Sequence, residues 1–151
     1  MIQIDIQRTG FPVKIGDVEL WFDSSIENLR KFFNVDELAK KKLEQVQERA
    51  NNIQFPEKVD FETIKNLDPE TVDTALDLNK EFIAAQYDII FGDGTFKKLY
   101  AKYPDIIALE KALDIVGVAI AQKIEEQEEE RKKEVEKKKS EYLNKKKQKR
   151  K

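Results

Sequence analysis

Hydrophobic and polar residues alternate along the first 22 positions of the chain. The two-residue period covers residues 2–6, returns at 13–15 and again at 18–22. Breaks at Thr9-Gly10 and Gly16-Asp17 carry residues that are typical of tight turns. Because successive side chains of a strand point to opposite faces, this pattern predicts a three-stranded antiparallel β-meander with one apolar face.

From residue 24 onward the apolar residues follow the spacing of a helix. Ser24 or Ser25 is expected to cap a first helical region, which is either continuous or divided at Asn34. A second start signal, Asp68 as the cap and Pro69 at the first helical position, opens the main helix of the chain. Its apolar residues form one stripe, as a core-facing helix requires.

Two more helices complete the pattern. A glycine corner over residues 92–94 leads into a short helix at 96–102, and the last helix begins near Asp105. Apolar residues of this last helix step by three and four up to Ile124, as in a core-facing or coiled-coil seam. The sequence therefore predicts an α+β fold that is mainly α: an N-terminal β-meander packed on a three- to four-helix bundle, with a long charged C-terminal helix.

The charge balance changes abruptly at Glu125. The whole chain has 28 Lys and Arg against 30 Asp and Glu, a net charge of −2. Residues 125–151 contain 8 acids and 12 bases, which leaves a net charge of −6 for residues 1–124. We expect a globular domain over 1–124, with the meander in 1–22 and helices in 25–124, followed by a charged helical extension with a basic tail.

Catalytic chemistry has little support in the composition. The chain contains no cysteine and no histidine, which excludes thiol nucleophiles, Ser-His pairs and zinc-finger ligand sets. The glycine-bearing residues 91–96 lack the spacing of a phosphate-binding loop, and a corner between helices explains both glycines. Acid pairs such as Asp73 and Asp77 fit a solvated helix face better than a metal site. We expect no enzyme, no metal and no cofactor.

The cellular compartment is inferred from the length of the apolar runs and from the N-terminal residues. The longest apolar run is far shorter than the ~20 residues that cross a bilayer, and no signal peptide is visible at the N-terminus. A cytoplasmic protein without a membrane partner is the expectation.

The basic end of the chain begins after Asn144, near which the last helix is expected to fray. It could bind nucleic acid, an acidic protein or an anionic membrane, or it could be a solvated tail. No aromatic residues alternate with these cations, so the solvated tail is favoured and nucleic-acid binding is not expected. Its cations are Lys145, Lys146, Lys147, Lys149, Arg150 and Lys151.

Aromatic residues gather around the glycine corner in greater number than a small helical core needs. We expect most of them in the core and part of them in a protein-binding patch. The seam of the last helix is a second candidate surface for a partner or for self-association. The candidate partner-binding residues are Phe91, Phe96, Leu99, Tyr100 and Tyr103 at the corner, and Leu113, Val116, Ile120 and Ile124 on the seam.

Two stretches of the chain resemble the tail assembly chaperones of long-tailed phages and prophages of Gram-positive bacteria. They are residues 87–100, which read YDIIFGDGTFKKLY, and residues 103–106, which read YPDI. Those proteins pair a helix ending in Phe-Gly-x-Gly with a short helix carrying Phe-x-x-Leu/Ile-Tyr. A final helix then fades into Glu and Lys, as this chain does.

The resemblance implies a non-enzymatic function in the cytoplasm of the bacterial host. Such chaperones bind the long helical tape measure protein, and in some cases the tail tube protein, during tail assembly, and they are absent from the finished virion. Many also exist in a longer frameshifted form. The alternatives are a small cytoplasmic helical adaptor and a nucleic-acid-associated protein that uses the basic tail.

Overall fold

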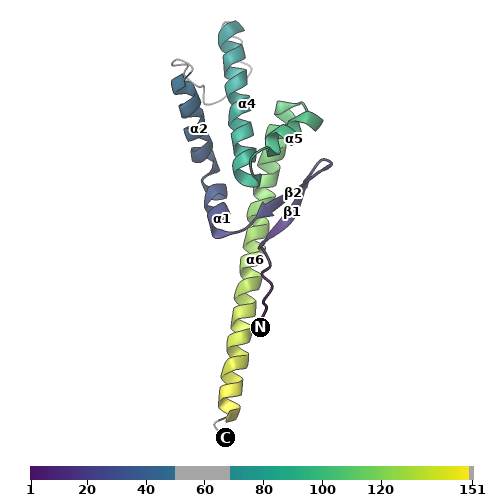
Figure 1. The fold of residues 1–151 in the computed structure, drawn as a ribbon, viewed down its shortest axis with the longest axis vertical. Helices are drawn as coiled ribbons and strands as arrows, with labels where there is room; N and C mark the ends of the chain where they lie inside the picture. Colours follow the sequence, from purple (N-terminus) through teal and green to yellow (C-terminus); the bar gives the residue numbers. More distant parts are fainter. Residues whose placement is uncertain (50–68, 150–151) are drawn as a thin grey trace. The chain divides into compact units, whose positions relative to one another are not determined.

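A computed structural model describes residues 1–49 and 69–149 of the chain (Figure 1). Over these residues it contains one two-stranded antiparallel sheet and five helices, so the predicted α+β, mainly α fold class is confirmed. The expected cap Asp68 and the connection over 54–68 lie outside the described residues. The elements are β1 (Gly10–Ile15), β2 (Val18–Asp23), α1 (Ile26–Phe33), α2 (Val35–Arg49), α4 (Pro69–Phe91), α5 (Thr95–Lys102) and α6 (Ile106–Lys149).

The two strands form a hairpin in which Ile15 pairs with Val18 across a two-residue turn. Gly16 in this turn has a φ of +58°, a conformation that favours glycine. A Cβ at Gly16 would also collide with the ring of Tyr103. The hydroxyl of that tyrosine accepts a hydrogen bond from the backbone N–H of Asp17 at 2.9 Å. The tip of the hairpin is therefore held by the residue that follows α5.

The expected first strand is not formed, because the described part of the chain contains two strands and residues 1–9 belong to neither. The predicted turn at Thr9-Gly10 does not reverse the chain. Gly10 is already the first residue of β1, opposite Asp23, and the carbonyl of Thr9 accepts from the N–H of Ser24 at 3.2 Å. The N-terminal segment thus leaves the hairpin in line with β1.

Local capping sets the start and the end of α1, and of the two expected caps, Ser24 and Ser25, the structure selects Ser25. The hydroxyl of Ser25 accepts from the N–H of Asn28 at 3.3 Å, and the carboxylate of Asp23 accepts from the N–H of Ser25 at 2.9 Å. Asn34 is the C-cap, and α2 begins at the next residue. The helical region is therefore divided at Asn34, one of the two alternatives that the pattern left open.

The core of the first part of the chain is built on α4, which contacts α1, α2, α5 and β2 (Figure 1). The ring of Phe22 from β2 is fully buried, with ring centroids 5.5 Å from Phe32 of α1 and 6.4 Å from Phe91 of α4. Tyr87 is also fully buried, and its hydroxyl donates to the carbonyl of Leu109 at 2.5 Å. These contacts join the hairpin, three helices and the start of α6.

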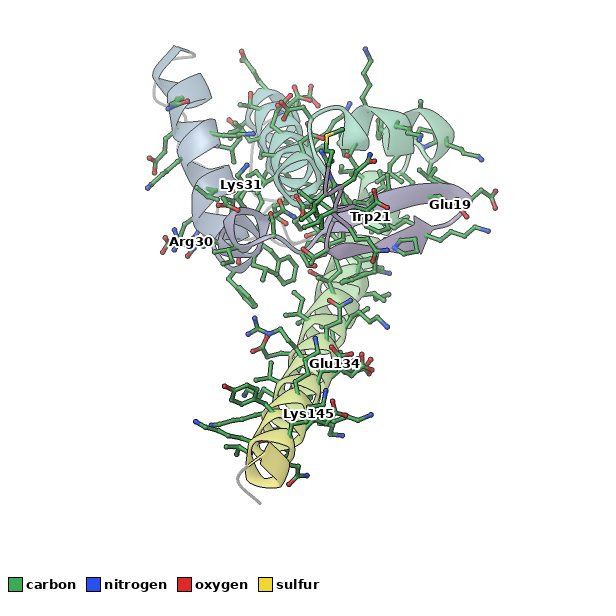
Figure 2. All side chains as sticks on the ribbon, turned by 60° about the horizontal axis from the view of Figure 1, so that its bottom comes forward. Glu19, Trp21, Arg30, Lys31, Glu134 and Lys145 are labelled. Atoms are coloured by element: carbon green, nitrogen blue, oxygen red, sulfur yellow. The ribbon has the colours of Figure 1, made fainter. Side chains whose placement is uncertain are left out.

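The chain divides into two compact units, Met1–Ala112 and Leu113–Lys151, whereas the sequence analysis placed the boundary after Ile124. The second unit is the continuation of α6, which remains helical past Asn144 to Lys149. Leu113, Val116 and Ile120 are buried, while every residue of 131–146 is exposed. Side chains such as Glu134 and Lys145 extend outward from this helix in Figure 2.

Replacing Tyr87 by Phe tests the hydrogen bond at the centre of the first unit. The change removes the only polar atom of a fully buried side chain, and we expect the free energy of unfolding to fall by about 1 kcal/mol. Urea unfolding followed by circular dichroism measures it. Tyr142→Phe is the matched control because Tyr142 is 66% exposed, and it should leave the unfolding midpoint unchanged. Equal midpoints for both variants would contradict this role of Tyr87.

Candidate functional site

A hollow of about 590 Å³ in the first unit is open to solvent. Residues of β2, α1, α2 and the C-terminal end of α4 line it, and we call it the α2 groove. Its apolar part consists mainly of Trp21, Leu38, Ile89 and Phe91. Each of these side chains is at least partly accessible. The groove therefore offers an apolar floor that remains in contact with water.

The charges of the α2 groove are divided by sign between different elements. The cations come from α1 and α2 (Lys31, Lys41 and Lys42), whereas the anions come from the end of β2, from α4 and from the corner (Asp23, Asp88 and Asp93). In the described part of the chain, none of these lysines forms an ion pair. A partner with acidic and basic side chains flanking an apolar stripe would meet complementary charges.

Trp21 is the only tryptophan of the chain, and a glycine on the opposite strand makes room for its ring. Gly10 has a φ of +154°, and a Cβ there would lie 2.5 Å from the carbonyl oxygen of Phe22 and 2.7 Å from the indole. The indole remains 49% exposed (Figure 2). An exposed aromatic face at the edge of an apolar groove is a common feature of protein-binding sites.

Two smaller hollows adjoin the α2 groove. One, of about 340 Å³, shares Lys42, Gln45 and Asp88 with it. The other, of about 440 Å³, shares Lys31, Leu38 and Lys41 and adds Arg30 of α1. Since adjoining hollows share residues, they form one extended depression that follows α2. Such a depression suits an elongated partner better than a compact small molecule.

The glycine corner fixes one end of the groove. The carboxylate of Asp88 accepts from the N–H of Phe96 at 3.0 Å, and the hydroxyl of Thr95 donates to the carbonyl of Gly92 at 2.7 Å. Gly92 and Gly94 have φ values of +110° and +90°, as the chain reverses between α4 and α5. Both glycines are thus explained by the turn, as the sequence analysis expected.

The structure separates the candidate residues of the corner. Phe91 lines the α2 groove, whereas Phe96 and Leu99 are buried in the core. Tyr100 is half-buried beneath the ammonium group of Lys80, which lies 4.1 Å from the ring centroid. Tyr103 holds the hairpin tip. Of these five residues, Phe91 alone lines the groove.

The candidate residues of α6 belong to the second unit. Leu113, Val116 and Ile120 are buried, and Ile124 is half-buried. Lys145 and Lys146 are exposed, consistent with a solvated tail. The side chains of Lys147 and Lys149 and the whole of Arg150 and Lys151 lie outside the described part. A partner-binding role for the seam or the tail stays a prediction.

Sequence reasoning missed Trp21 and the three lysines of the groove as functional candidates. Two signals were present: Trp21 is out of phase with the apolar residues of its strand, and Lys41 and Lys42 belong to a run of three lysines at 40–42. Lys31 carries no such signal. Neither signal shows that distant segments meet at one groove, which only the packing of α2 on α4 brings about.

Among the described residues, no group of three or more acidic side chains is placed to hold a metal ion. Each described helix is also too short or too polar to cross a lipid bilayer. Comparison with known proteins adds no relative: no family model, curated protein or solved structure matches the chain.

Replacing Gly10 by Ala tests the placement of Trp21. The added methyl group would displace either the Phe22 carbonyl or the indole, so we expect the tryptophan fluorescence to shift to longer wavelength as the ring moves into water. Gly117→Ala is the control, because no atom lies within 4 Å of a Cβ there. An unchanged emission maximum for Gly10→Ala would contradict the close contact between Gly10 and Trp21.

Proposed function

We propose that this chain is a non-enzymatic tail assembly chaperone of a long-tailed phage or prophage. It binds the tape measure protein in the host cytoplasm until the tail tube polymerises around it, and it is absent from the finished virion. The observation that carries the proposal is the extended α2 groove, with its apolar floor and its charges of opposite sign from different elements.

The groove supports the proposal through the chemistry of its expected client. A tape measure protein is a long helical chain, and an amphipathic helix carries apolar residues at spacings of three and four with charges on either side. Such a helix places its apolar stripe on Trp21 and Phe91 and its acidic side chains beside Lys31, Lys41 and Lys42. The binding mode is therefore a helix lying in a groove.

The openness of the site agrees with a temporary complex. The lysines are exposed, so their ion pairs with a client are screened by salt and weak individually. An assembly chaperone must release its client when the tail tube forms, and many weak contacts allow this better than a deep pocket does.

The sequence around the corner is the second support. The residues that resemble tail assembly chaperones, 87–100 and 103–106, form the end of α4, the corner, α5 and the start of α6. Phe91, Gly92 and Asp93 of this stretch also line the α2 groove. The stretch that carries the resemblance thus contributes directly to the proposed binding site.

Charge reversal of the groove tests the proposal. The proposal predicts that a neighbouring gene encodes a long helical tape measure protein. That protein is co-expressed with the chain, and soluble tape measure protein is measured after centrifugation. The triple variant Lys31→Glu, Lys41→Glu, Lys42→Glu should reduce the soluble fraction about tenfold, because three exposed ion pairs of about 0.5 kcal/mol each together contribute about 1.5 kcal/mol to binding.

The matched control is Lys97→Glu, Lys98→Glu, Lys111→Glu, which makes the same change in net charge at exposed lysines outside the groove. It should keep the tape measure protein soluble. Equal solubility with both triple variants, or the absence of a tape measure gene beside this one, would contradict the proposal.

A further inference from the structure

The N-terminal segment, residues 1–8, exposes three isoleucines to solvent. Ile2, Ile4 and Ile6 are 91%, 79% and 91% exposed, although isoleucine is usually buried. Within the described part of the chain, the backbone of residues 1–8 makes no hydrogen bond. The segment has the alternation and the β-branched residues of a strand, but it has no strand partner.

The hairpin of the same chain is not in position to supply that partner. The carbonyl of Thr9 already bonds to the N–H of Ser24, so the segment continues outward from the last pair of the β1–β2 ladder. Figure 1 shows it as an extended trace from the N-terminus to β1. Folding back onto β1 would require a turn at Gly10, which is instead paired opposite Asp23.

We propose that residues 2–6 of two copies of this chain pair with each other as antiparallel strands, related by a two-fold axis through Ile4. In this register Ile4 faces Ile4 of the second copy, Ile2 faces Ile6, and Gln3 faces Asp5. All six isoleucines then lie on one face of the ribbon as cross-strand neighbours. The interface is isologous, as in most symmetric dimers.

The alternation and the charge of the segment select this register. If the pair is centred on Asp5, two carboxylates lie directly opposite each other and repel, and Ile2 lies opposite Arg8 and loses its apolar contact. Both effects disfavour this register. Parallel pairing also brings Asp5 beside Asp5. Centring on Ile4 instead gives Gln3 an amide N–H to donate to the Asp5 carboxylate, so the segment is complementary to itself.

Disulfide trapping tests the pairing in the full chain, because the chain contains no cysteine of its own. Ile4→Cys places two thiols opposite each other on the two-fold axis, and mild oxidation should give a covalent dimer of twice 17.7 kDa that reducing agent dissolves. The control Glu19→Cys lies at the hairpin tip, is exposed, and should cross-link at least about tenfold more slowly.

The register is tested by mixing two variants. Gln3→Cys and Asp5→Cys should cross-link with each other faster than either does alone. The proposed pairing would be overturned if Ile4→Cys and Glu19→Cys cross-linked at equal rates. It would also be overturned if Gln3→Cys and Asp5→Cys each cross-linked faster alone than in the mixture.

Sedimentation equilibrium of charge variants supplies a readout without cysteine. Ile4→Lys should shift the mass of the unmodified dimer toward 17.7 kDa, whereas Gln3→Lys should retain the dimer because the new ammonium group faces Asp5. Neither change should alter the circular dichroism spectrum, since residues 1–8 make no hydrogen bond to the described fold. A monomeric unmodified chain at all concentrations would overturn the proposal.

Discussion

The buried face of α4 is the surface on which the rest of the first unit depends. A two-stranded hairpin is at most marginally stable by itself, and this one gains a core by inserting Phe22 between Phe32 of α1 and Phe91 of α4. One helical turn before Phe91, the hydroxyl of Tyr87 reaches the carbonyl of Leu109. The same face of one helix thus orders the hairpin, its neighbouring helices and the start of α6.

The α2 groove is a consequence of this packing. Because Ala39 and Leu43 of α2 are buried while Leu38 and Lys41 remain accessible, α2 packs on α4 along one side and leaves a depression along the other. The hairpin then places Trp21 at its edge. The floor of the groove is therefore attached to the buried core, whereas its lysines are exposed, as the proposed temporary binding of a client requires.

Features that depend on neighbouring residues were predictable from the sequence, and features that depend on distant ones were not. The cap at Ser25, the corner at Gly92 and the start of α6 after Asp105 follow from local chemistry. The third strand was predicted wrongly, because alternation shows that a segment can be a strand and does not show what it pairs with. The groove was missed for the same reason: its walls are far apart in sequence and meet only through tertiary packing.

Amide hydrogen exchange with and without a tape measure fragment tests the central claim, that the α2 groove is the client-binding surface. A helical client lying in the groove should slow exchange in α2 and at the C-terminal end of α4, around residues 35–45 and 88–93, and leave the second unit unchanged. Slowed exchange confined to Leu113–Lys149, with no change along α2, would contradict the account and assign client binding to the long charged helix.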